Sequence, residues 1–331
     1  MPMKIETELN AMDVILRAEA IDGFVPEEVF DFHAHVMEPA SYAPTTLGPH
    51  LNGMTVSPTS YRHAMSLLLP GERLTETLVF PFPAREHDRP AINRWMFEQI
   101  DLLSGSFKAR GLAIVSPHDD PTVVAAEMAT GRCAGLKPYH FYAWKGDTSQ
   151  VGLEDFAPEW MWKLCDRHGA VLMLHLMRDD AVAEPGNSEA LVRLSKKYPG
   201  CQAVLAHVAR SFNHRTSRGL RALKDLPNIW VDMSAITEAE SIRAAIEILG
   251  PHRVLYGSDY PISHLRGRCV TVGDQFLWLY TEEAKAPKMT LVGIESLRAL
   301  RDACTQAGLG PKEVQGIFRD NGRAVLKCFH R

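Results

Sequence analysis

The chain has 331 residues, of which 46% are hydrophobic and 23% charged, and its formal net charge is −4. That composition is typical of a globular protein, and without a run of lysine or arginine it argues against a nucleic-acid partner. No apolar stretch is long enough to span a bilayer, the opening MPMKIETELN lacks a signal-peptide pattern, and the six scattered cysteines form no CxxC pair, so we expect a cytoplasmic protein with reduced thiols.

Residues 1–26 precede the first strand-like segment, and we expect them to form a helix or tail outside the main fold. Beyond them, short apolar segments bounded by turn residues recur along the chain. Several are nearly continuous apolar runs, which is typical of strands buried on both faces of a parallel sheet. The eight segments cover residues 28–35, 76–83, 110–117, 133–141, 170–177, 201–208, 228–235 and 253–261.

Most of these strands are separated by segments in which apolar residues follow a helical spacing. Two of the helices carry a proline in the first turn and three end near a glycine, as helix termini prefer. The alternation predicts an α/β fold, a (β/α)8 TIM barrel in a single domain of residues 1–331. A doubly wound open sheet is the alternative, but GRCAGLKP at 131–138 lacks the GxGxxG spacing. The predicted helices cover residues 90–107, 121–129, 158–169, 187–200 and 238–250.

Two further segments follow strands on the face where barrel active sites lie. Residues 37–58 contain proline, glycine, serine and threonine with little pattern, and loops of this length are usually functional or disordered. We expect them to form a lid or pocket wall, and residues 261–288 to contribute likewise. Residues 289–331 are predicted to add C-terminal helices packed on the side of the barrel.

Polar side chains gather at the ends of the predicted strands. In a TIM barrel the carboxyl ends of all strands meet at one mouth, where the active sites of this fold lie. His33 and His35 alternate on one strand, so their side chains share a face. The residues at strand ends are His33, His35, Lys137, His175, His207 and Asp259, with Asp232 and Ser234 on the seventh strand as weaker candidates.

These segments resemble the amidohydrolase superfamily, in particular its amidohydrolase-related branch of lactonases and decarboxylases. The likeness spans roughly residues 28–328 and is carried by DFHAH (31–35), LMLH (172–175), VLAH (204–207), YGSDYP (256–261) and DNGRAVL (320–326). The resemblance implies that His33, His35 and His175 bind one divalent metal, with Asp259 as a fourth ligand or as the partner of a metal-bound water. His207 would be the acid/base residue. Such a donor set suits Zn²⁺, although Mn²⁺, Fe²⁺ or Co²⁺ tolerate the same ligands.

Other residues near the strand ends are candidates for substrate binding. Two-metal members of the wider superfamily carry a carboxylated lysine on the fourth strand, but the resembling branch usually uses one metal, so Lys137 is taken as a cation that binds substrate or supports the site. Arg178 and Arg210 each follow a site histidine by three residues, close enough to grip a carboxylate, or else they form surface salt bridges. Tyr139 and His140 either line the pocket or fill core.

The leading functional hypothesis is a metal-dependent hydrolase that acts on an ester, lactone or amide of a small, anionic molecule. Metal binding lowers the pKa of a water molecule to about 7, and His207 or Asp259 moves the proton. Non-oxidative decarboxylation at the same site is the alternative, although decarboxylases of aromatic acids often replace the first histidine of the HxH pair, which this chain keeps. The third hypothesis is a barrel that binds a ligand without catalysing a reaction. A homo-oligomer formed through the C-terminal helices is compatible with the sequence.

Overall fold

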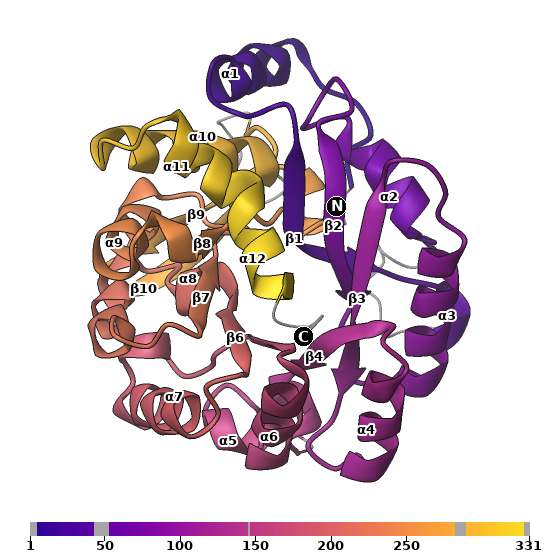
Figure 1. Ribbon diagram of the computed structural model, residues 1–331. Coiled ribbons are helices and arrows are strands. Elements are labelled where there is room, and N and C mark those ends of the chain that lie inside the picture. Colours follow the sequence, from indigo (N-terminus) through magenta and orange to yellow (C-terminus); the bar gives the residue numbers. More distant parts are fainter. Residues whose placement is uncertain (1–4, 43–52, 145, 282–288, 328–331) are drawn as a thin grey trace.

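The structure, a computed structural model, describes residues 5–42, 53–144, 146–281 and 289–327. Eight parallel strands follow one another around a barrel in the order of the sequence, and helices cover the outside (Figure 1). The predicted TIM barrel is confirmed. Its strands are β1 (Val29–Val36), β2 (Leu74–Pro81), β3 (Lys108–Val115), β4 (Cys133–Pro138), β5 (Val171–Leu174), β6 (Gln202–Leu205), β7 (Ile229–Asp232) and β8 (Val254–Leu255).

The barrel closes between β8 and β1 through a loop. Only Val254–Leu255 of the predicted segment 253–261 forms a strand. The chain beyond it approaches β1 most closely at Gly257, where an added Cβ would lie 2.7 Å from Cβ of His33. The backbone N–H of Asp259 donates to the carbonyl oxygen of His33 (2.8 Å), and that of His35 donates to Tyr260 (2.9 Å). This pairing holds Asp259 beside both histidines of the first strand.

A bulge in β1 turns the histidine pair into the barrel. Asp31 pairs with Thr77 and Ala34 with Val79, so β1 has one residue more than β2 between these pairs. The Asp31 carboxylate stabilises the bulge by accepting the backbone N–H of His33 (3.0 Å). Phe32 therefore faces the barrel core, and its neighbour His33 faces the interior as well.

The five helices expected between the strands are present. Asp88 accepts the backbone N–H of Ala91 (2.9 Å) at the start of α3, and Gly169, with φ 61°, ends α6 in the left-handed conformation. The helices are α3 (Arg89–Asp101), α4 (Pro121–Ala129), α6 (Glu159–His168), α7 (Pro185–Lys197) and α9 (Ala239–Leu249). Helices α1 (Ala11–Ile21), α2 (Pro58–Met65) and α5 (Leu153–Phe156) complete this part of the fold, and the segment α8 (Ala206–Arg210) is a short turn whose residues from His207 on have positive φ.

The C-terminal helices occupy two different places. Helix α10 (Val292–Gln306) packs against α9 and α1 on the side of the barrel, as expected. After α11 (Pro311–Gln315), helix α12 (Asn321–Lys327) instead covers the end of the barrel where the strands begin. Its Val325 and Leu326 join the interior core formed with Phe30 and Phe32, because the first layer of the barrel is apolar and needs a cover.

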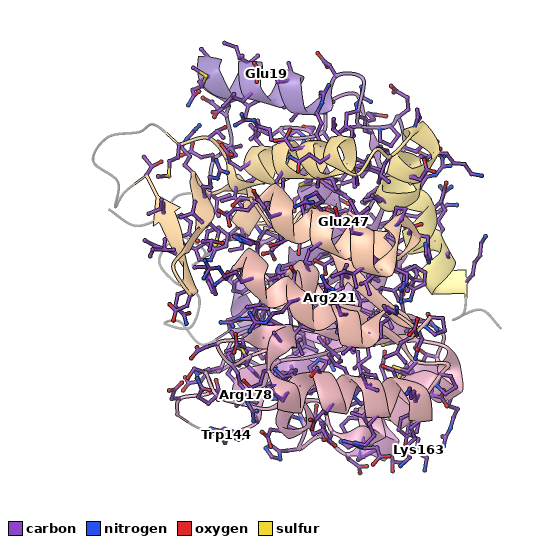
Figure 2. The ribbon with its side chains drawn as sticks, turned by 90° about the vertical axis from the view of Figure 1, so that its left-hand side faces the viewer. Glu19, Trp144, Lys163, Arg178, Arg221 and Glu247 are labelled. Atoms are coloured by element: carbon purple, nitrogen blue, oxygen red, sulfur yellow. The ribbon has the colours of Figure 1, made fainter. Side chains whose placement is uncertain are left out.

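The segment after β8 contains a β-hairpin whose two strands were not predicted from the sequence. Strands β9 (Gly267–Val272) and β10 (Gln275–Tyr280) pair antiparallel and lie at the end of the molecule opposite α12 (Figure 2). Of the other predicted lid segment, residues 43–52 lie outside the described residues. None of the helices in the described part of the chain is both long and apolar enough to cross a membrane.

Candidate active site

Seven of the predicted site residues converge on one cavity at the carboxyl ends of the strands. It has a volume of about 240 Å³. A larger cavity of about 460 Å³ lies between α3 and α4, but no histidine lines it, so the smaller cavity is the candidate active site. Its lining residues are His33, His35, Phe82, Pro83, Lys137, Tyr139, His175, His207, Phe212, Asp259, Ile262, Trp278 and Tyr280.

His33, His35 and Asp259 form a compact group of donor atoms. Oδ1 of Asp259 lies 3.3 Å from Nε2 of His33 and 3.2 Å from Nε2 of His35, and all three residues are buried. Burial alone would raise the pKa of Asp259, but the hydrogen bonds to the two imidazoles hold this pKa well below its usual range. Burial lowers the pKa of His35 to about 4, which keeps this imidazole neutral.

The spacing of these atoms fits a divalent metal. Zinc bonds of about 2.1 Å at tetrahedral angles place neighbouring ligand atoms about 3.4 Å apart, close to the two separations given above. Two imidazole nitrogens and one carboxylate oxygen are also donors that Zn²⁺ accepts. The described structure thus contains a group able to hold a metal ion, as expected for His33, His35 and Asp259.

His175, the third predicted imidazole ligand, lines the same cavity but stands apart from this group. Its ring centroid is 5.1 Å from that of His207 and 5.3 Å from that of Tyr139. Among the described residues it belongs to neither set of histidine and carboxylate atoms close enough to share an ion. Its buried Nδ1 has no hydrogen-bond partner among them, and burial, with nearby cationic groups, lowers its pKa well below the usual value.

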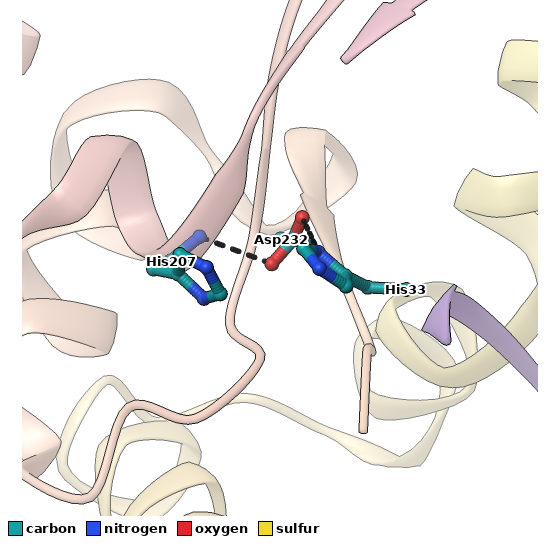
Figure 3. Close-up of side chains that lie close together, drawn as sticks. All are labelled: His33, His207 and Asp232. Carbon is teal, nitrogen blue, oxygen red and sulfur yellow. Dashed lines mark hydrogen bonds and ion pairs between the residues drawn. The ribbon is translucent and has the colours of Figure 1, made fainter. Parts of the chain in front are cut away.

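A buried carboxylate on β7 connects His33 with His207. Oδ2 of Asp232 contacts Nδ1 of His33 at 2.9 Å, while Oδ1 accepts the backbone N–H of His207 at 3.1 Å (Figure 3). Burial opposes the charge of Asp232, but the His33 imidazole lowers its pKa to about 2. Burial would likewise lower the pKa of His33, yet Asp232 and Asp259 raise it to about 9.

His207 sits on a strained turn. Residues 207–210 all have positive φ, from 50° to 60°, and none is glycine. The left-handed conformation costs an L-residue about 1–2 kcal/mol, and such strain is often kept where it places a functional group. Nδ1 of His207 contacts the carbonyl oxygen of Ser234 at 2.9 Å, and its ring stacks on Phe212 with 5.2 Å between centroids. Burial lowers the pKa of His207.

Lys137 brings an unpaired positive charge to the cavity. Its side chain is 1% exposed, and its ammonium nitrogen has no hydrogen-bond partner within the described part of the chain. It lies 5.0 Å from the ring centroid of Phe80 and 5.6 Å from that of Tyr139. Burial lowers the pKa of Lys137 to about 8. A buried cation without a partner is suited to an anionic ligand.

The other predicted substrate-binding residues divide into two groups. Tyr139 lines the cavity, whereas His140 does not, because its Nδ1 contacts the hydroxyl of Thr148 at 2.8 Å. Arg178, for which the sequence left substrate binding and a surface salt bridge open, also lies outside the lining. Its guanidinium donates to the carbonyl oxygen of Gln150 (3.2 Å) and pairs with Glu184 (3.3 Å), so it joins two loops near the molecular surface (Figure 2).

Arg210 does not line the cavity, although its charge is among those that lower the pKa of His175 within it. It donates to the carbonyl oxygen of Arg178 (2.8 Å), and its guanidinium carbon lies 5.4 Å from the ring centroid of Phe276. Burial first, and the charge of Arg210 next, lower the pKa of His140 to about 4. The role of Arg210 in substrate binding stays a prediction.

Two features of the site were underestimated or missed. Asp232 and Ser234 ranked low because one aspartate and one serine form no motif, although they follow the same strand-end rule as the histidines. Residues 261–288 were expected to contribute to the pocket wall, and Ile262, Trp278 and Tyr280 of this segment line the cavity, but the aromatic wall that the hairpin forms with Phe212 was not predicted. Trp278 and Tyr280 stack with 5.6 Å between ring centroids, and Trp278 lies 5.6 Å from Phe212. Alternating aromatic residues at 276, 278 and 280 were the available signal for this strand.

Comparisons with known proteins agree with this arrangement. Residues 30–328 match the Amidohydrolase family model Amidohydro_2. A curated relative, L-fucono-1,5-lactonase of Burkholderia ambifaria, is 28% identical over 124 residues, which are 33% of this chain and 42% of that protein. The aligned part thus spans less than half of this relative.

Solved structures share the fold over nearly the whole chain. A putative 2-pyrone-4,6-dicarboxylic acid hydrolase from Pseudomonas putida has a TM-score of 0.54 at 15% identity, covering 92% of this chain and 99% of that one. For 5-carboxyvanillate decarboxylase from Sphingomonas paucimobilis the TM-score is 0.57 at 15% identity, with 91% and 99% covered. At 15% sequence identity, these structural matches show only that the fold is shared. With the family match spanning most of its length, the chain belongs to the amidohydrolase family.

Proposed function

We propose that the protein is a metal-dependent hydrolase that cleaves an ester, lactone or amide bond of a small carboxylated molecule. The observation that carries the proposal is the close spacing of Nε2 of His33, Nε2 of His35 and Oδ1 of Asp259, at 3.2–3.3 Å, in a cavity that His207 also lines. A donor group beside a separate histidine supplies the two elements that hydrolysis requires, an activated water molecule and a proton carrier.

The proposed metal is Zn²⁺, held by His33, His35 and Asp259, with His175, which lines the same cavity, as a further ligand. When bound, such an ion polarises a carbonyl group and lowers the pKa of water. His207 holds the proton that moves. Its Nδ1 donates to the carbonyl oxygen of Ser234, which leaves the lone pair on Nε2. As the water oxygen bonds to the carbonyl carbon, Nε2 takes its proton, and it returns this proton to the leaving oxygen or nitrogen as that bond breaks.

The cavity supports a small, flat and anionic substrate. About 240 Å³ lies below the usual volume of ligand pockets, and five of its thirteen lining residues are aromatic. Lys137 offers the substrate a buried positive charge. The wall formed by Phe82, Phe212 and Trp278 offers few hydrogen-bonding groups to a polyhydroxylated ring. We therefore favour an unsaturated carboxylated lactone over a sugar lactone.

Decarboxylation of an aromatic acid by the same residues is the second candidate. The aromatic residues of the lining, among them Phe82, Phe212 and Trp278, favour it because they can stack on the ring of an aromatic acid. In that reaction a substrate carbon is protonated while carbon dioxide leaves, so the two functions differ in their products.

The test uses purified protein stripped with a chelator and reloaded with Zn²⁺, Mn²⁺ or Co²⁺. A panel of lactones, amides and aromatic acids is followed by acid release and by carbon dioxide evolution. We expect acid release without carbon dioxide, lost on chelation, and a fall of kcat by about 10²–10⁴ in His207→Ala with metal content unchanged. His252→Ala, at an exposed position near the start of β8, is the control. Carbon dioxide as the product would establish decarboxylation instead, and metal-dependent binding without turnover would establish a binding barrel.

A further inference from the structure

We propose that Asp232 and Ser234 are positioning residues that fix Nε2 as the reactive nitrogen of both His33 and His207. The pair would thereby couple the metal ligand on β1 to the proton carrier that follows β6. The part concerning His207 rests on the proposed function, whereas the part concerning His33 needs only metal binding. Both residues are fully buried, and they reach two histidines that are far apart in the sequence.

The orientation of the Asp232 carboxylate is determined by three donors on one oxygen. Oδ1 accepts the backbone N–H of His207 (3.1 Å), the backbone N–H of Ser234 (3.1 Å) and the hydroxyl of Ser234 (2.5 Å). Oδ2 is thereby directed at Nδ1 of His33, 2.9 Å away. Because a carboxylate only accepts hydrogen bonds, Nδ1 of His33 carries a hydrogen and Nε2 is the nitrogen available to a metal.

The same network determines the tautomer of His207. Its Nδ1 lies 2.9 Å from the carbonyl oxygen of Ser234, which can only accept. The Ser234 hydroxyl uses its single hydrogen toward Asp232, so it presents lone pairs to Nδ1 of His207 (3.0 Å) and of His33 (3.2 Å). Every donor in the network then has an acceptor, and Nε2 is the nitrogen that each imidazole presents to the cavity. His207 leaves this nitrogen unprotonated, and on His33 it is the nitrogen whose proton a bound metal would displace.

This assignment also explains why His33, His207 and Asp232 do not make a second metal site. Their donor atoms lie close enough together to hold an ion. However, the nitrogens involved in the contacts are the two Nδ1 atoms, both of which carry hydrogen, and the Ser234 oxygen lies within 3.2 Å of all three residues. The group is a hydrogen-bond network.

The decisive variant is Asp232→Asn. Its amide nitrogen cannot face the three donors that Oδ1 now accepts, so it must face Nδ1 of His33. There it donates, and the hydrogen of the imidazole moves to Nε2, the nitrogen needed for metal. We expect the affinity for Zn²⁺, measured by competition with a chromogenic chelator, to fall about 10- to 100-fold. Circular dichroism and thermal melting establish that the variant folds, and Zn²⁺ affinity equal to that of the wild type would overturn the proposal.

Ser234→Ala is the second variant and keeps the test decisive if Asp232→Asn does not fold. It retains the backbone N–H and carbonyl group, so Zn²⁺ affinity should change by less than about threefold. The loss of the shared hydroxyl should lower kcat about tenfold with KM unchanged, because His207 is less firmly held in the transition state. Ser195→Ala is the matched control, a buried serine on α7 whose hydroxyl has no partner among the described residues. Unchanged kcat in Ser234→Ala would overturn the role assigned to Ser234.

A spectroscopic measurement separates failure of this proposal from failure of the proposed hydrolase. In protein loaded with Zn²⁺ and labelled with ¹⁵N-histidine, the His207 signal, identified by its loss in His207→Ala, should show hydrogen on Nδ1. Hydrogen on Nε2 would refute the positioning role whatever reaction the enzyme performs. Hydrogen on Nδ1, together with reduced Zn²⁺ affinity in Asp232→Asn, would support the proposal even if no substrate were hydrolysed.

Discussion

Replacing Lys137 by methionine should stabilise the protein and impair its activity. Burial lowers the pKa of this lysine from 10.5 to about 8, with Asp232 and Asp259 opposing the shift. One pKa unit corresponds to about 1.4 kcal/mol, so at pH 7 the buried charge destabilises the folded protein by about 3 kcal/mol. Methionine fills the same space without charge. We therefore expect Lys137→Met to raise the free energy of unfolding by up to about 3 kcal/mol, and to lower kcat/KM for a carboxylated substrate at least about tenfold.

The pH dependence provides the check on this reasoning. The pKa of Lys137 is lower in the folded than in the unfolded protein, so the unfolded chain binds more protons between about pH 8 and 10.5, and wild-type stability rises with pH there. The difference between wild type and variant should shrink from about 3 kcal/mol at pH 7 to about 1 kcal/mol at pH 9.5. Urea unfolding of the metal-free proteins measures both values. Lys163→Met, at an exposed position on α6 (Figure 2), is the control. A variant less stable than the wild type, or a difference independent of pH, would refute the argument.

Three further predictions concern the frame of the site. The hydroxyl of Tyr61 donates to the buried Asp31 carboxylate, so Tyr61→Phe should lower the free energy of unfolding by about 2 kcal/mol in urea titrations; a change below about 0.5 kcal/mol would contradict this. Burial lowers the pKa of His264 to about 4, so between pH 7 and pH 5, as the unfolded histidine gains its proton, the wild type should lose about 2 kcal/mol more stability than His264→Gln in urea titrations; equal losses would contradict this. Trp278→Ala should raise KM about tenfold with kcat nearly unchanged, because the indole contacts substrate away from the reacting atoms; a fall in kcat alone would argue against that role.

Much of the architecture follows from local patterns. Runs of apolar residues bounded by turns predicted all eight strands, because strands of a buried parallel sheet need no alternation and are easily counted. The last strand was overestimated, since its carboxyl half pairs with β1 as a loop around Gly257. The β9–β10 hairpin was missed because its segment was interpreted by position after the barrel and not by its alternating aromatic residues. The position of α12 was predicted wrongly because the sequence pattern does not indicate which end of the barrel a helix must cover.

The position of residues at strand ends was a reliable guide to the site, but not to each residue's role. It placed His33, His35, His207 and Asp259 in one cavity, where the structure shows them. It did not decide between the two interpretations of Arg178, whose guanidinium contacts Gln150 and Glu184 and does not line the cavity. For a long, flexible side chain, spacing along the sequence does not predict the position of the charged group.

The sequence by itself determined which residues are available for chemistry and that two of them, His33 and His35, share one face of a strand. It did not determine whether that face points into the barrel or away from it. Phe32 already occupies the interior, and in a regular strand His33 would then point outward; only the extra residue that β1 carries relative to β2 brings both to the cavity. In the same way, the contacts of Asp232 with His33 and His207 depend on closure of the barrel, which brings β7 near β1 across 199 positions of sequence. Tertiary structure decided these points because they depend on register and on strand neighbours, which no local pattern encodes.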